Sequence, residues 1–212
     1  MMMRARGFSL IELLITLAIL GFLLAAAIPS FHAWMSNSRV RLVADTLQND
    51  LRKAQAEAVR RNHQTALILT ASTSSLSALN ATGSTTGGNW FMRVVNANSS
   101  ESTSDATVGG SYFLGASTIG ANYGVSMSAS TAMVCFNSIG RPVTNSSAAN
   151  LPSGGTYNLA CTAPADAATP LTYTLSGATS SVRSLKVTVS LGGQIRMCDP
   201  AKTLSSSNPD GC

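Results

Sequence analysis

The first pattern in the chain is a long apolar run near its N-terminus. Residues 13–28 carry no charge, and Thr16 and Gly21 are the only weak interruptions. A helix over residues 8–28 would be about 30 Å long, which is enough to cross the hydrocarbon core of a bilayer. The run therefore predicts one transmembrane helix.

Charged residues at the start of this run predict its orientation. Residues 1–7 carry Arg4 and Arg6 and no acid, which favours a cytoplasmic N-terminus and places the bulk of the chain outside the cytoplasm. Glu12 lies a few residues into the apolar helix, where a carboxylate is costly. We therefore expect Glu12 to have a dedicated partner.

The helical pattern continues beyond the apolar run but becomes amphipathic. Pro29 should kink the helix where it leaves the membrane, and residues 29–62 form its second half. Apolar residues recur there at spacings of three and four: Val40, Val43, Leu47, Leu51, Ala54 and Ala58. This stripe predicts a helix that packs on a globular domain and exposes its charged face, which includes Asp50, to solvent.

After Asn62 the period changes to that of β-strands. We expect residues 63–212 to form one β-rich head, with a closing hairpin that turns at Gly192-Gly193. The expected strands are 65–70, 90–95, 111–114, 132–137, 157–161, 171–175 and 184–197. Polar segments rich in small residues, such as 71–89 and 96–110, are assigned no element. The fold class is α+β.

Composition limits the partners and the number of domains. With 212 residues, 45% hydrophobic and 11% charged, the chain has room for one membrane helix and one globular domain. The net charge of +5 becomes 5 − 2 = +3 if Arg4 and Arg6 are removed with a leader. Such a mild charge is weak support for nucleic-acid binding.

Four cysteines lie in the part of the chain that is expected outside the cytoplasm. An even number in an oxidising compartment predicts two disulfides, for which three connectivities exist. Pairing Cys161 with Cys198 is favoured because both end apolar β-like runs, which leaves Cys135 to fix the tail through Cys212. Their spacing does not match a zinc site, and we expect neither a metal nor a cofactor.

The string Gly7-Phe8-Ser9-Leu10-Ile11-Glu12, followed by the apolar helix, resembles the class III leader of type IV pilins and of type II secretion pseudopilins. The resemblance implies that a prepilin peptidase cuts between Gly7 and Phe8 and N-methylates Phe8. It also implies the type IV pilin fold: a long kinked helix, transmembrane in its first half, packed on a disulfide-stapled head. Glu12 would neutralise the Phe8 amine of a neighbouring subunit, since one partner alone is an uncompensated buried charge.

Two other interpretations of the N-terminus remain open. A secretory signal cleaved after Ala27 would also have a basic start and an apolar run, but such runs are shorter and have no use for Glu12. A plain single-span anchor explains the apolar run and leaves the Gly-Phe-x-x-x-x-Glu pattern to chance.

Two further segments narrow the resemblance to the minor pilins of the GspH/FimT/FimU family. Residues 133–142 resemble the strand and Gly-Arg turn of that family, and residues 184–200 resemble its closing hairpin. The implied role is to prime or join assembly of a type IV pilus, in a tip subcomplex that contacts the major pilin and other minor pilins. The implied partners also include an inner-membrane assembly platform, and membrane lipid before assembly. The implied location is the inner membrane with a periplasmic head, and then the extracellular pilus (fimbrium).

Two functional alternatives follow from the same residues. A type II secretion pseudopilin of the GspH type shares leader, helix and head. A FimT-like DNA-binding minor pilin in natural transformation would have a Gly-Arg-x-Arg motif, of which residues 193–196 lack the first arginine. The cations available for phosphate contact in that region are few: Arg183, Lys186, Arg196 and Lys202.

An enzyme is not expected, because neither a nucleophile elbow nor a carboxylate pair can be identified. The true start among Met1, Met2 and Met3 stays open.

Overall fold

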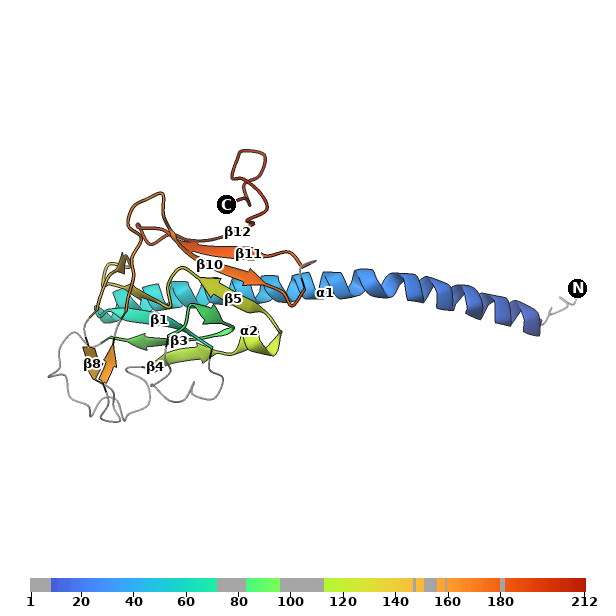
Figure 1. Cartoon of the computed structure of the whole chain (residues 1–212), viewed down its shortest axis with the longest axis horizontal. Helices are drawn as coiled ribbons and strands as arrows, with labels where there is room; N and C mark the ends of the chain where they lie inside the picture. The colour runs from blue at the N-terminus through green and yellow to red at the C-terminus, as the bar shows by residue number, and fades with distance from the viewer. Residues whose placement is uncertain are drawn as a thin grey trace, which may run out of the picture.

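The protein consists of one long helix and a β-rich head at the C-terminal end of that helix, as the computed structural model shows (Figure 1). The structure describes residues 9–71, 83–95, 113–146, 148–150, 156–158, 160–179 and 182–212. The α+β fold predicted from the sequence, with a long N-terminal helix and a disulfide-stapled head, is confirmed.

Helix α1 (Leu10–Arg61) is continuous over 52 residues. It passes through Pro29 without a break, and Figure 1 shows only a gentle curve along the helix. Neither observation measures a bend at Pro29 itself, so the kink expected there stays a prediction. The helix ends at Asn62, which adopts a left-handed conformation with φ 53°. The next amide, that of His63, donates to the carbonyl of Ala58 at 3.2 Å, so the chain leaves the helix in the turn that commonly ends helices.

Two antiparallel five-stranded sheets form the head. The first, sheet A, has the order β4 (Phe113–Ser117), β3 (Asn89–Val94), β1 (Thr65–Thr70), β6 (Met133–Phe136), β7 (Pro142–Val143). The second, sheet B, has the order β12 (Ile195–Cys198), β11 (Leu185–Val189), β10 (Leu171–Ser176), β5 (Ser126–Ala129), β2 (Thr86–Gly87). A short hairpin of β8 (Ala148–Asn150) and β9 (Thr156–Asn158) and a one-turn helix α2 (Ile119–Asn122) complete the described elements.

The core lies where the second half of α1 meets both sheets. Figure 1 shows β10, β11 and β12 of sheet B on one side of the helix and β1, β3 and β4 of sheet A on the other. All six residues of the predicted apolar stripe, Val40 to Ala58, have no exposed surface, which confirms the stripe. Strand β1 is buried on both faces: Leu67 and Leu69 join the core beneath the helix, while Ala66 and Ile68 join a second cluster behind sheet A.

The disulfide connectivity predicted from the sequence is wrong. The structure pairs Cys135 with Cys161 and Cys198 with Cys212, instead of Cys161 with Cys198 and Cys135 with Cys212. Cys135 lies on β6 of sheet A, and the segment with Cys161 lies beside that strand, whereas Cys198 ends β12 of sheet B. The predicted pair would have joined two different sheets, which the positions of the cysteines in the sequence could not reveal.

Candidate assembly site

The first half of α1 has no contact with the head. All its large apolar side chains from Leu10 to Trp34 that the structure describes are at least half exposed. The most apolar 18-residue window of the helix has a mean hydropathy of 2.6 and is not buried at all, and the helix is long and apolar enough to cross a membrane. A soluble protein would not leave such a surface in water, so this half-helix needs lipid or other subunits around it.

Glu12 lies in the first turn of α1, with an exposed side chain. It is the only Asp, Glu, Lys or Arg from Ser9 to Ser38. The helix N-terminus carries a partial positive charge that favours a carboxylate in this turn. Gly7 and Phe8, the predicted cleavage and methylation residues, lie outside the described residues.

Gln55 of α1 joins the two sheets. Its side-chain amide Nε2 donates to the carbonyl of Gly140 at 2.6 Å and to that of Gly193 at 2.9 Å. Gly140 lies in the turn between β6 and β7, and Gly193 lies in the turn between β11 and β12. One amide therefore brings together the Gly-Arg turn and the closing hairpin, which the sequence had singled out separately.

Both turns require glycine at these positions. Gly140 and Gly193 have φ values of +78° and +86°, which side chains rarely adopt. A Cβ atom on Gly193 would come within 2.5 Å of the Gly140 carbonyl oxygen and 2.7 Å of the Gln55 amide nitrogen. The close packing of turn, turn and helix therefore depends on glycine.

A second polar contact from α1 reaches into sheet A. The indole Nε1 of Trp90 donates to Oδ2 of Asp50 at 2.7 Å, and Trp90 itself is fully buried. The start of a core strand at Trp90, predicted from the sequence, is confirmed. The sequence had assigned Asp50 to a solvated charged face, and the structure shows that it satisfies a buried indole instead.

The basic residues considered for DNA contact are held by the C-terminal tail. Arg183 forms an ion pair with Asp199 and lies 3.6 Å from Asp210, and Lys202 pairs with Asp210 at 2.6 Å. Through Nη2, Arg196 donates to the carbonyls of Pro209 at 2.7 Å and of Gly211 at 2.8 Å. Lys186 lies on the neighbouring strand β11. Three of the four candidate cations thus already have partners within the chain.

The Arg183 pair shifts the pKa values of its members. The side-chain hydrogen bond from Arg183 lowers the pKa of Asp199 below its usual value, and the same bond raises that of Arg183. The hydrogen bond from Lys202 lowers the pKa of Asp210. At neutral pH these acids therefore offset the cations, so the tail region presents little net charge to a polyanion.

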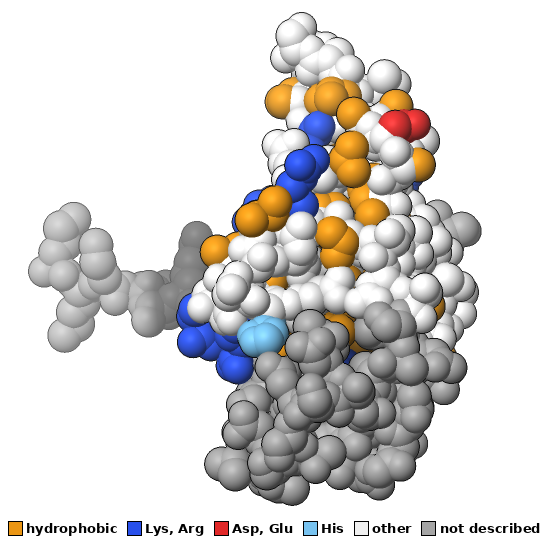
Figure 2. Space-filling model, turned by 90° about the vertical axis from the view of Figure 1, so that its left-hand side faces the viewer, with side chains coloured by type: hydrophobic (Ala, Val, Ile, Leu, Met, Phe, Trp, Pro, Cys, Tyr) orange, Lys and Arg blue, Asp and Glu red, His pale blue; other side chains and the backbone are white. Residues whose placement is uncertain are grey.

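Basic side chains also gather at the end of the head where α1 ends. Figure 2 shows Lys and Arg side chains along one flank of this face, with hydrophobic side chains scattered between polar ones. Glu57 accepts hydrogen bonds from Arg60 and Arg61, and the bond from Arg60 is the main cause of its lowered pKa.

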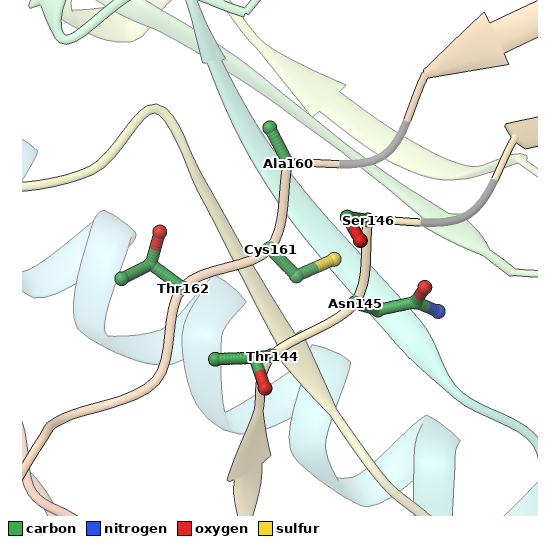
Figure 3. Close-up of a pocket in the computed structure, with 6 residues that line it drawn as sticks. All are labelled: Thr144, Asn145, Ser146, Ala160, Cys161 and Thr162. Carbon is green, nitrogen blue, oxygen red and sulfur yellow. The ribbon is translucent and has the colours of Figure 1, made fainter.

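A pocket of about 280 Å³ lies beside the Cys135–Cys161 disulfide. Its walls are residues 144–146 and 160–162, which Figure 3 shows as two facing segments with the Cys161 sulfur pointing toward Asn145 and Ser146. Across this pair the backbones of Asn145 and Cys161 exchange hydrogen bonds of 2.9 and 3.3 Å. Hydroxyl and amide groups dominate the lining, and this set includes no pair for acid-base catalysis. Within the described residues, no three His, Cys, Asp or Glu side chains come together as a metal site.

The N-terminus matches a known family model. Residues 2–28 match the prokaryotic N-terminal methylation motif, the leader of type IV prepilins. The protein is type IV pilin-like. This leader and the long helix with a β-rich head point to a structural, non-enzymatic protein that is anchored in a membrane through its apolar half-helix.

Two solved structures are similar to this pilin-like protein, both of the type IV minor pilin FimU of Pseudomonas aeruginosa in different crystal forms. The first is 13% identical, covers 80% of this chain and 95% of FimU, and has a TM-score of 0.48. The second is 14% identical, covers 76% of this chain and 94% of FimU, and has a TM-score of 0.44. No curated protein matches the sequence.

Proposed function

We propose that this pilin-like protein is a minor pilin that primes or joins assembly of a type IV pilus, in a tip subcomplex with the major pilin and other minor pilins. The observation that carries the proposal is the bare apolar half of α1. Most of this half lies within the matched methylation motif, and Glu12 is its one charge. A helix of this kind can exchange lipid for the helices of other subunits with little change in surroundings. The head remains free to make the specific contacts.

In this proposal a prepilin peptidase cuts after Gly7 and methylates Phe8. The new amine and Glu12 of an adjacent subunit then form the pair that makes burial of both charges tolerable. The head starts in the periplasm, the assembly platform lies in the inner membrane, and the mature protein reaches the extracellular filament.

Mass spectrometry of sheared surface filaments, beside the envelope fraction, tests this proposal. We expect a peptide that begins at N-methylated Phe8 in the filaments. The same processed peptide confined to the envelope would favour a secretion pseudopilin or a periplasmic DNA-binding protein. An N-terminus at Ile28 would identify a secretory signal and would contradict the proposal.

The role of the carboxylate has its own test. Glu12→Gln keeps the shape of the side chain and removes its charge, so it should leave processing and membrane insertion intact and reduce incorporation into filaments. Thr16→Ala is the matched control, because Thr16 lies one turn further along α1 and its hydroxyl only donates to the carbonyl of Leu13 at 2.9 Å. Normal incorporation of Glu12→Gln would refute the pairing with Phe8.

A further inference from the structure

The apolar half of α1 ends at a pair of aromatic rings. Phe31 and Trp34 are 55% and 65% exposed, and their ring centroids are 5.9 Å apart. Tryptophan prefers the boundary between hydrocarbon and headgroups, where its ring is partly apolar and its N–H can reach water. At the other end of the apolar half, the first charged residue is Glu12.

The distance between these two ends matches a bilayer. From Glu12 to Trp34 there are 22 residue steps, which correspond to about 33 Å along a helix. The hydrocarbon core of a typical bilayer is about 30 Å thick. When Trp34 lies at the outer boundary, Glu12 therefore lies at the inner boundary and not in the middle of the hydrocarbon.

Residues 36–39, which follow Trp34 and Met35, are polar or cationic. Arg39 and Arg41 are exposed, the side chain of Arg41 by 73%, and they lie about 40 Å and 44 Å from Glu12 along the helix. With Trp34 at the outer boundary, the two arginines lie about 7 Å and 11 Å further out, beside a headgroup layer that is about 5–8 Å thick, and their long side chains can reach back into it. At the same level the head begins: Asn37 Oδ1 accepts from the backbone N–H of Arg183 at 2.8 Å, and Val40 is the first fully buried residue.

We propose that Phe31, Trp34, Arg39 and Arg41 form a lipid-headgroup contact that fixes the depth of the unassembled subunit, with the head resting on the outer surface and Glu12 at the inner headgroup boundary. The proposal rests on the membrane-anchored state of the proposed function. Lipid is the occupant because the spacing of the polar ends equals the bilayer thickness, because the rings lie where the apolar run stops, and because cations follow at headgroup level.

This depth determines the stage of assembly at which the Glu12 carboxylate loses its water. In the membrane, Glu12 can stay hydrated at the inner boundary, so insertion of the subunit does not need a partner for it. Movement of the subunit outward, into a filament, draws Glu12 into apolar surroundings. The need for an opposite charge thus arises at extraction, and lipid-inserted subunits can wait as monomers.

The two tryptophans of the chain make the depth measurable. The full-length protein is reconstituted into phosphatidylethanolamine and phosphatidylglycerol vesicles that contain lipids brominated either near the headgroup or near the chain ends. We expect a larger loss of Trp34 emission with bromines near the headgroup. Trp34→Phe leaves only Trp90, which is fully buried in the head and should lose no emission with either lipid. Equal or greater quenching of Trp34 by the deep bromines, or none by either, would overturn the inference.

Cysteine labelling measures the depth of position 12, at the other end of the apolar half of α1. All four native cysteines are in disulfides, so a single introduced cysteine is the only free thiol. In inside-out membrane vesicles, a membrane-impermeant maleimide should label Glu12→Cys and spare Leu20→Cys, which lies about 12 Å further into the apolar run. Both positions are on the bare half-helix, so neither change affects the head. Protection of Glu12→Cys, or equal labelling of the two variants, would overturn the predicted depth.

Flotation with the vesicles separates this inference from the proposed function. A protein that floats but shows a deep Trp34 or a protected Glu12→Cys loses only the predicted depth. A protein that does not float has no membrane-anchored state, which overturns both.

Discussion

Removal of the Gln55 amide is expected to destabilise the head. Gln55→Ala deletes the donor that satisfies the carbonyls of Gly140 and Gly193, at 2.6 and 2.9 Å. These carbonyls belong to turns of two different sheets, and the Gln55 side chain contacts both. The variant should therefore loosen the attachment of both turns to α1.

The size of the effect follows from the two hydrogen bonds. Each contributes a net value of about 0.5–1.5 kcal/mol, so the expected loss in the free energy of unfolding is about 2 kcal/mol. For a chain of this size, a loss of about 2 kcal/mol lowers the midpoint of thermal unfolding by about 4–8 °C. Gln55→Glu should cost more at neutral pH, because it places carboxylate oxygens against two carbonyl oxygens.

Trp90 reports this loss directly. It is fully buried, so its fluorescence follows unfolding of the head in a denaturant titration of the full chain in detergent, on a Trp34→Phe background. Gln48→Ala is the matched control, because Gln48 donates to the carbonyl of Ile195 at 3.4 Å and Arg52 donates to the same carbonyl. We expect that control to cost less than about 0.5 kcal/mol, since the carbonyl keeps a donor. A Gln55→Ala variant as stable as Gln48→Ala would refute the assignment of Gln55 as the link between the sheets.

Three other changes test the head. Tyr173→Phe should leave stability unchanged or raise it by up to about 2 kcal/mol in denaturant titration, because the buried hydroxyl has no hydrogen-bond partner among the described residues. Asp199→Asn should reduce the loss of stability that the head shows in acid. Arg183 lowers the pKa of Asp199, so the ionised carboxylate stabilises the fold above its unfolded pKa of about 3.9. That contribution is lost as the pH falls through the lower pKa of the folded state. Replacement of both Cys198 and Cys212 by Ser should cost about 3 kcal/mol or less in the same titration, since their separation is 14 residues and the loop they close is short; a loss well above this value would contradict a disulfide that fixes only the tail.

Periodicity in the sequence was sufficient to predict the helix and its two faces. The stripe from Val40 to Ala58 follows a helical period without interruption, and its burial was predicted residue by residue. Strand β1 and the closing hairpin were also predicted, because apolar runs with a Gly-Gly turn leave few alternatives. Strands β2, β5, β7 and β8 were missed, since Ser126–Ala129 is half polar and the other three strands are only two or three residues long.

Contacts between distant segments could not be predicted from local patterns. The disulfide pairing depends on which sheet each cysteine joins, and Asp50 changes from a surface charge to the partner of Trp90 only when α1 lies on sheet A. Gln55 had no signal of its own, because a single glutamine among the charged residues of a helix is unremarkable in a sequence. The glycines at 140 and 193 were the available clue, since both lay in predicted turns.

The short junction between α1 and β1 determines how the head carries mechanical load. Only Asn62, His63 and Gln64 separate the end of the helix from the central strand of sheet A, and Figure 1 shows β1 alongside the helix. A pull along α1 thus reaches β1 nearly parallel to the strand, and the strand is paired to β3 over six residues and to β6 over four. In this shear geometry many hydrogen bonds must break together rather than one after another. The head is therefore built to resist tension that arrives through its helix.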